Sequence, residues 1–225
     1  MRTLLFDIDG TLLRTNNGGR GAMQTALEQE FDLCPARVDI PFCGRTDREI
    51  LTQLLVINQL AANSENRRRL QNRYLAVLPD VLHQRGGEIL PGVVELLGQL
   101  ADDSRVCVSV MTGNLQEGAA RKLDHFGLRH YFRWIVGGDE DSHRDDLARR
   151  AKEVIRKHSG DEATERVTVI GDTPADIRCG HAIGAQSIGV CTGRYDRASL
   201  EAEKPLLVLD DLSDIAAVYP VLVSI

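Results

Sequence analysis

Residues 3–12 read TLLFDIDGTL, an apolar run that ends in two aspartates and a Gly-Thr pair. The apolar run predicts a short buried strand, and Asp9-Gly10 is a typical turn signal after it. Runs of the same kind recur along the chain, at 105–113, 133–138, 166–172, 186–193 and 205–210. Segments with helical spacing separate most of them, and strands that alternate with helices form a parallel sheet with helices on both faces. The predicted fold class is therefore α/β with a parallel-sheet core.

The alternation is interrupted once, after the first strand. The interrupting segment shows three helical tracts, from Gly21 to Phe31, from Asp47 through residue 61 and from Ser64 to Leu82, with a loop at 33–46. Asp47 is expected to cap the second helix, and no strand is expected in this segment. We therefore predict an all-helical cap domain, 15–88, inserted into an α/β core domain made of 1–14 and 89–225.

Composition excludes several classes of protein. The chain has 225 residues with a net charge of −6, and hydrophobic residues make up 43% of it. Such a chain is not disordered, its apolar runs fall short of the ~20 residues that span a bilayer, and its acidity suits no nucleic-acid backbone. Asp7 and Asp9 stand where a signal peptide needs its apolar stretch. The five cysteines form no C-x-x-C pair. We expect a cytoplasmic protein with reduced thiols that binds neither a membrane nor a nucleic-acid polymer.

Polar side chains follow four of the predicted strands, and ligands of open parallel sheets bind outside the carboxyl ends of strands. The residues expected at this edge are Asp7, Asp9, Gly10 and Thr11, then Thr112, Gly113 and Asn114, then Arg144, and finally Asp172 and Asp176. Four carboxylates this close repel one another unless a cation is present. Mg²⁺ prefers carboxylate oxygens and pairs with phosphate. The pattern therefore points to Mg²⁺-dependent phosphoryl chemistry.

Two aspartates two residues apart suit two roles in that chemistry. Asp7 is the candidate nucleophile, which would form an aspartyl-phosphate, and Asp9 is the candidate acid and base. Thr112 precedes a helix, where its hydroxyl and the amides of Gly113 and Asn114 suit phosphate oxygens.

The other groups complete the predicted site. Arg144 would supply positive charge to the nucleophile and the phosphoryl group. Asp172 would complete the metal site, and Asp176 would bind a metal-bound water or orient the cation. Gly10 and Thr11 are placed with the phosphate-binding residues.

Some of these motifs have ordinary explanations when taken singly. Asp7–Gly10 resembles half of a calcium loop, but the glycine stands fourth instead of sixth, and Gly18 occupies the position of the final Glu. GDTPAD at 171–176 also fits an ordinary helix cap, and residues 18–21 do not make a dinucleotide-binding glycine motif. The combination at successive strand ends favours an active site.

The set FDIDGTL (6–12), VMTGN (110–114) and VIGDTPADI (169–177), with a basic residue before a helix, resembles the haloacid dehalogenase-like superfamily. Within it, the chain is similar to phosphoglycolate phosphatase-like hydrolases with a helical cap. The resemblance implies a Rossmann-like core, a mobile cap, and Mg²⁺ held by Asp7, the Asp9 carbonyl and Asp172. It also implies Asp7 as nucleophile, Asp9 as acid and base, and Thr112 on phosphate.

The basic residue departs from the family pattern. The family most often has a lysine before the third helix, commonly as Lys-Pro, whereas this chain has Arg144 in HRDDL, 28 residues before Asp172. Arginine bears the same charge, so Arg144 is assigned this role. Lys152 is the alternative, but it lies two turns into the helix and should point elsewhere.

The resemblance also separates the reactions of the superfamily. Asp9 argues against a dehalogenase, which has no leaving oxygen to protonate. Phosphonate hydrolases of this kind use a cap lysine, and no lysine precedes Lys122. The predicted function is a Mg²⁺-dependent phosphatase of a small phosphomonoester, such as phosphoglycolate, a nucleotide or a sugar phosphate. A sugar phosphomutase and a catalytically silent phosphate-binding protein remain as alternatives.

The cap is expected to select the substrate. Arg45, Thr46 and Asp47 of GRTDREI (44–50) are the candidate contacts on resemblance alone, followed by Arg20. Helix capping and surface charge are the alternative roles for these residues. The expected partner is a small phosphorylated metabolite, bound by a monomer or a homodimer.

Overall fold

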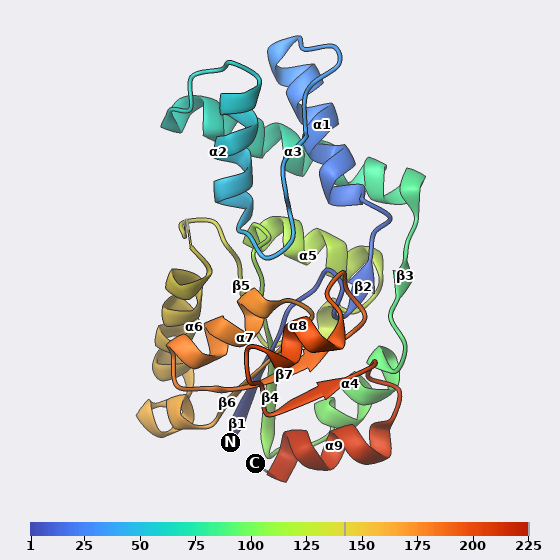
Figure 1. The fold of residues 1–225 in the computed structure, drawn as a ribbon, viewed down its shortest axis with the longest axis vertical. Helices are drawn as coiled ribbons and strands as arrows, with labels where there is room; N and C mark the ends of the chain where they lie inside the picture. Colours follow the sequence, from blue (N-terminus) through green and yellow to red (C-terminus); the bar gives the residue numbers. More distant parts are fainter. Residues whose placement is uncertain (142, 225) are drawn as a thin grey trace.

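A computed structural model of the chain describes residues 1–141 and 143–224. Its centre is a six-stranded parallel sheet with the strand order β5-β4-β1-β6-β7-β8 (Figure 1). The strands are β1 (Arg2–Phe6), β4 (Val106–Met111), β5 (Ile135–Val136), β6 (Val167–Gly171), β7 (Gln186–Val190) and β8 (Leu207–Leu209). The predicted α/β fold with a parallel-sheet core is confirmed.

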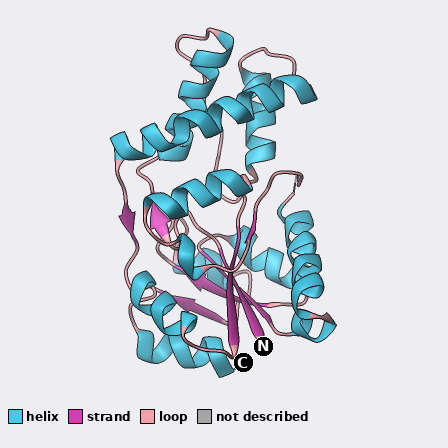
Figure 2. Ribbon diagram, turned by 180° about the vertical axis from the view of Figure 1, so that it is seen from behind, coloured by secondary structure: helices cyan, strands magenta, loops and turns pink. Residues whose placement is uncertain are grey.

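The pleat of β1 sends alternate side chains to opposite faces of the sheet. Leu4 and Phe6 belong to an apolar cluster on one face, and Leu5 belongs to a second cluster on the other. The first face is covered by α4 (Val93–Ala101), α5 (Gln116–His125) and α9 (Ile215–Ser224), and the second by α6 (Arg144–Ser159) and α7 (Pro174–Ala182) (Figure 2). The same alternation places Asp7, the residue after the strand, on the side of α6 and α7.

Three further helices lie beyond the carboxyl edge of the sheet, at the top of Figure 1. They are α1 (Gly18–Phe31), α2 (Asp47–Ile57) and α3 (Ser64–Arg85). They pack around an apolar cluster of their own that includes Leu27, Leu54 and Tyr74. All three helices were expected from the sequence, and the loop between α1 and α2 was expected as well.

Two short strands that the sequence did not predict join the core to these helices. β2 (Leu13–Arg14) and β3 (Glu88–Ile89) pair antiparallel where the chain leaves the core and where it returns. An exposed ion pair between Arg14 and Glu88, 2.6 Å long, reinforces the pairing. Two residues are too few to show the period of a strand, so the pattern of apolar residues does not reveal these strands.

The ends of several helices differ from the prediction. Thr46, and not Asp47, is the N-cap of α2, because its hydroxyl accepts a hydrogen bond from the Glu49 amide at 3.3 Å. Asp47 is the first residue of that helix. The short helix α8 (Arg197–Glu201) and two 3₁₀ helices, η1 (Arg129–Tyr131) and η2 (Asp161–Glu165), were not predicted. None of the described helices combines the length and the apolar character needed to cross a bilayer.

Candidate active site

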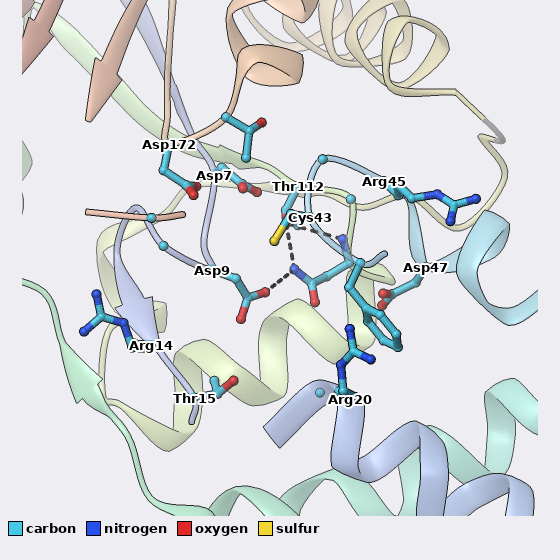
Figure 3. A pocket seen from close by; sticks show the side chains of 18 of the residues that line it. Asp7, Asp9, Arg14, Thr15, Arg20, Cys43, Arg45, Asp47, Thr112 and Asp172 are labelled. Carbon is cyan, nitrogen blue, oxygen red and sulfur yellow. Dashed lines mark hydrogen bonds between the residues drawn. The ribbon is translucent and has the colours of Figure 1, made fainter. Parts of the chain in front are cut away.

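A pocket of about 340 Å³ opens between the carboxyl edge of the sheet and the three helices above it (Figure 3). The core contributes Asp7, Asp9, Thr112, Asn114, Lys122, Arg144 and Asp172 to its lining. The helical segment contributes Arg20, Cys43, Arg45, Asp47 and Tyr74. The pocket therefore brings together most of the residues that the sequence singled out, from segments far apart in the chain.

Asp7 is buried at the end of β1, where its amide donates a hydrogen bond to the Ile170 carbonyl at 2.9 Å. Its carboxylate forms a group with those of Asp172 and Asp176, in which one oxygen from each lies within 4.8 Å of the others. Burial raises the pKa of Asp7 to about 6, against the pull of Arg144 and with a further push from Asp176. Burial, together with the carboxylates of Asp176 and Asp7, raises the pKa of Asp172 well above its ordinary value.

Arg144 is the first residue of α6 and is buried beside these carboxylates. Its Nη2 lies 2.8 Å from Asp176 Oδ1 and 3.5 Å from Asp7 Oδ2. Burial lowers the pKa of its guanidinium, but the carboxylates of Asp176 and Asp7 outweigh burial and raise it. The alternative cation, Lys152, donates to the Ile183 carbonyl at 3.0 Å and does not line the pocket.

Asp176 has both carboxylate oxygens engaged. Oδ2 accepts hydrogen bonds from the amide and the hydroxyl of Thr173, which completes a capping box at the start of α7. Oδ1 forms an ion pair with Arg144 but accepts no hydrogen bond from the described residues. The helix-cap explanation of GDTPAD therefore holds for Thr173 and Asp176, while Asp172 of the same motif faces the pocket.

Gly10 and Thr11 shape the turn after β1. Gly10 has a φ of +89°, and a Cβ there would lie 2.5 Å from Asp172 Oδ2, so the turn requires glycine. The hydroxyl of Thr11 donates to Asp172 Oδ1 at 3.1 Å, and Thr11 does not line the pocket. The structure therefore shows Thr11 holding Asp172, while its predicted contact with phosphate stays a prediction.

Thr112 follows β4 and is fully buried. Its Oγ1 accepts a hydrogen bond from the Asn114 side chain at 2.8 Å, and the hydroxyl near Asp7 helps to lower the pKa of that carboxyl. Gly113 packs against the helical segment so closely that a Cβ would lie 2.1 Å from the Arg45 carbonyl oxygen. This loop precedes α5, as the sequence predicted for a phosphate-binding turn.

Asp9 has a cationic partner that the sequence analysis missed. Lys122 Nζ on α5 lies 2.6 Å from Asp9 Oδ2 and 2.7 Å from Asn114 Oδ1. A signal for it existed, because Lys122 interrupts the apolar stripe that Ala119, Leu123 and Phe126 form at helical spacing. A charged residue on a core-facing stripe indicates a buried polar partner.

The two arginines expected to contact substrate have other partners. The guanidinium of Arg45 donates to the carboxylate of Glu49 at 2.5 Å and to the side chain of Gln53 at 2.8 Å, and it points away from the aspartates (Figure 3). The guanidinium of Arg20 donates to the carbonyls of Val38 and Ile40 and stacks on the ring of Phe42. Both guanidinium groups thus have partners within the helical segment, and both residues line the pocket, so their contact with substrate stays a prediction. Thr46 does not line the pocket.

Asp47 connects α2 to the loop after β4. Its Oδ2 accepts a hydrogen bond from the Leu115 amide at 2.8 Å, and its own amide donates to the Gly113 carbonyl at 2.7 Å. Burial raises the pKa of Asp47 to about 6, although Lys122 and the Leu115 amide pull it down. Ionisation of Asp47 therefore lowers the stability of the folded state, and the size of this effect depends on pH.

We expect Asp47→Asn to raise the free energy of unfolding by about 2 kcal/mol at about pH 8 and to change it little near pH 4. The folded-state pKa of about 6 exceeds the ordinary 3.8. The cost of ionisation therefore appears as the pH rises through this interval and is complete above it. Asparagine retains an oxygen for the Leu115 amide and carries no charge. Urea unfolding of both proteins across this pH range measures the difference. A variant that is less stable than wild type at pH 8 would show that the negative charge stabilises the fold.

Comparisons with known proteins identify the family of the chain. The family model described as haloacid dehalogenase-like hydrolase matches residues 4–190. The chain is 27% identical over 219 residues to the probable phosphatase IndB of Dickeya dadantii, covering 94% of this chain and 90% of that protein. It is also 27% identical over 219 residues to phosphoglycolate phosphatase 1 of Pseudomonas aeruginosa, covering 95% and 78%.

Solved structures share the fold. A hydrolase from Pseudomonas syringae is 25% identical and superposes with a TM-score of 0.72 over 100% of both chains. A structure described as a putative beta-phosphoglucomutase from Thermotoga maritima is 22% identical, with a TM-score of 0.62 over 97% of this chain and 98% of that chain. At that identity the second likeness concerns the fold alone.

Proposed function

This chain belongs to the haloacid dehalogenase-like hydrolases that act on phosphate esters, and on that premise we propose that it is a Mg²⁺-dependent phosphatase of a small phosphorylated metabolite. One observation carries the proposal. Asp7 is buried in the pocket with Oδ1 free of any hydrogen bond from the described residues, while Oδ2 faces Arg144. A desolvated carboxylate oxygen without a partner, next to a buried cation, suits attack on a phosphoryl group.

The donor set fits a hard divalent cation. The unpartnered Asp7 oxygen and the raised pKa values of Asp7 and Asp172 describe a carboxylate group whose charge Arg144 alone does not balance. We propose that Asp7, Asp172 and the Asp9 carbonyl would hold Mg²⁺, which neutralises phosphate charge when bound. Asp176 would act through Arg144, because both of its oxygens are already engaged.

The reaction then has two steps. Asp7 Oδ1 bonds to phosphorus as the bond from phosphorus to the leaving oxygen breaks, and Asp9 donates a proton to that oxygen. Water next attacks the aspartyl-phosphate, Asp9 accepts the proton of that water, and phosphate leaves. Thr112 and the amides that follow it would bind the phosphoryl oxygens, and Arg144 would stabilise their charge.

We further propose that residues 15–88 form a cap domain that closes over the pocket and excludes water from the intermediate. The substrate would be a small phosphomonoester, with phosphoglycolate, nucleotides and sugar phosphates as the classes to compare. We place this activity in the cytoplasm, in a monomer or a homodimer.

Phosphate release from a panel of these esters tests the proposal. We expect protein treated with EDTA to lose at least about 90% of its activity and excess Mg²⁺ to restore it, because three carboxylates this close to a dianion need a cation. Release that persists after complete metal removal would contradict the metal requirement. No release from any ester, together with a trapped aspartyl-phosphate, would favour a phosphomutase. Neither release nor trapping would favour a silent phosphate-binding protein.

A further inference from the structure

Lys122 is a buried cation that the reaction proposed above does not use. Only 3% of its side chain is exposed, and its ammonium donates to Asp9 Oδ2 at 2.6 Å and to Asn114 Oδ1 at 2.7 Å. The Asn114 side chain in turn donates to the same Asp9 oxygen at 2.8 Å and to Thr112 Oγ1 at 2.8 Å. Two donors therefore converge on one oxygen of Asp9.

The other oxygen of Asp9 receives no hydrogen bond from the described part of the chain. The Asp9 side chain is 40% exposed and lines the pocket, whereas the lysine behind it is enclosed. Lys122 and Asn114 thus restrain the carboxylate from one side and leave Oδ1 available from the other. Because Oδ2 accepts two N–H bonds, any proton that this carboxyl group takes up or gives away is held at Oδ1.

Packing alone does not account for a lysine at this position. Its neighbours on α5, Ala119 and Leu123, are fully buried in the apolar core. The helical segment encloses the ammonium from the other side: a Cβ at Gly19 would lie 3.4 Å from Nζ and 4.0 Å from the Tyr74 hydroxyl. Burying an ammonium is costly unless it is paired, so an apolar side chain would suit a purely structural role better.

We propose that Lys122 is a positioning residue that orients Asp9 for proton transfer to the leaving oxygen. The inference rests on the proposed phosphatase function and extends it. With Oδ2 fixed by Lys122 and Asn114, Oδ1 delivers its proton to the ester oxygen as the bond from phosphorus to that oxygen breaks. The same oxygen then accepts a proton from the attacking water. Lys122 contacts neither the phosphoryl group nor the nucleophile in this arrangement.

The dependence of the rate on the leaving group tests this role. Lys122→Met keeps the length of the side chain and removes its charge and its donors. For an alkyl phosphate, whose leaving oxygen needs the proton, we expect kcat/KM, which reports the steps up to departure of the leaving group, to fall about 100-fold. For p-nitrophenyl phosphate, whose leaving group departs without protonation, we expect a fall of about threefold or less. Lys122→Gln, which keeps an N–H donor, should lie between wild type and Lys122→Met on the alkyl ester.

Lys152→Met is the matched control, because Lys152 donates to the Ile183 carbonyl outside the pocket, and both substrates should be hydrolysed at the wild-type rate. Equal losses on the two esters, or no loss on either, would overturn the role of Lys122 even if wild type remains a good phosphatase. Wild type that hydrolyses neither ester would overturn the proposed function itself. If Lys122→Met fails to fold, Lys122→Gln decides by the same ratio of the two losses.

Discussion

Asp7→Asn is expected to reduce phosphate release by at least about a thousandfold while the protein stays folded. Asparagine has nearly the shape of aspartate, so it fits the space beside Arg144, but its amide is no nucleophile. The stability should not fall at neutral pH. Because burial raises the pKa of Asp7 to about 6, its ionisation opposes folding above that pH, and the variant is free of that cost.

Steady-state phosphate release and thermal unfolding measure the two halves of this expectation. Acid quenching during turnover should trap a phosphoryl group on wild type and none on Asp7→Asn. Asp39→Asn is a suitable control, since Asp39 is exposed and makes only a long ion pair with Arg37 at 3.8 Å. An Asp7→Asn protein that turns over at the wild-type rate would remove Asp7 from the role of nucleophile.

Arg144→Met is expected to lower both activity and stability. Arg144 is the cation that faces Asp7 and Asp176 inside the protein, and removing one partner of a buried charge group costs about 3–5 kcal/mol. Activity should fall at least about 100-fold, because the charge that stabilises the phosphoryl group is lost. Arg144→Lys should be intermediate, since an ammonium is a compact point charge that does not span two carboxylates as a guanidinium does.

The stability loss of Arg144→Met should also depend on pH. Without the guanidinium, the folded-state pKa values of Asp7 and Asp172 rise further, because Arg144 lowers both. An acid with a raised folded-state pKa destabilises the fold as the pH rises above its ordinary value. Urea unfolding should therefore show a larger deficit at about pH 8 than at about pH 5. Unchanged activity in Arg144→Met together with a loss in Lys152→Met would instead assign the cationic role to Lys152.

The positions of Asp7, Thr112, Arg144 and Asp172 could be predicted because they depend on a simple rule of topology. Each follows a strand whose apolar pattern is readable, and parallel strands bring their carboxyl ends to one edge. No long-range information was needed beyond the alternation of strands and helices. Periodicity of the apolar residues, which is a local signal, also predicted the helices α1, α2 and α3.

What could not be predicted depends on how polar atoms find partners across the fold. Arg20 and Arg45 were expected to meet a ligand, but Val38, Ile40 and Glu49 use their donors within the helical segment. Buried carbonyl groups of a loop need donors, and the sequence does not show which arginine supplies them. Lys122 was missed for the converse reason, because its partners, Asp9 and Asn114, lie on other segments.

The antiparallel pairing of β2 with β3 has a consequence for how this architecture diversifies. Leu13 lies opposite Ile89, and Arg14 lies opposite Glu88, so the chain leaves the core and returns to it at neighbouring points. For the core, the long insertion is a loop whose ends are already held together, and the entropy of closing such a loop grows only slowly with its length. One helical insertion could thus be exchanged for another of different size with little cost to the sheet. The helical insertion and the residues at the strand ends are therefore free to evolve separately.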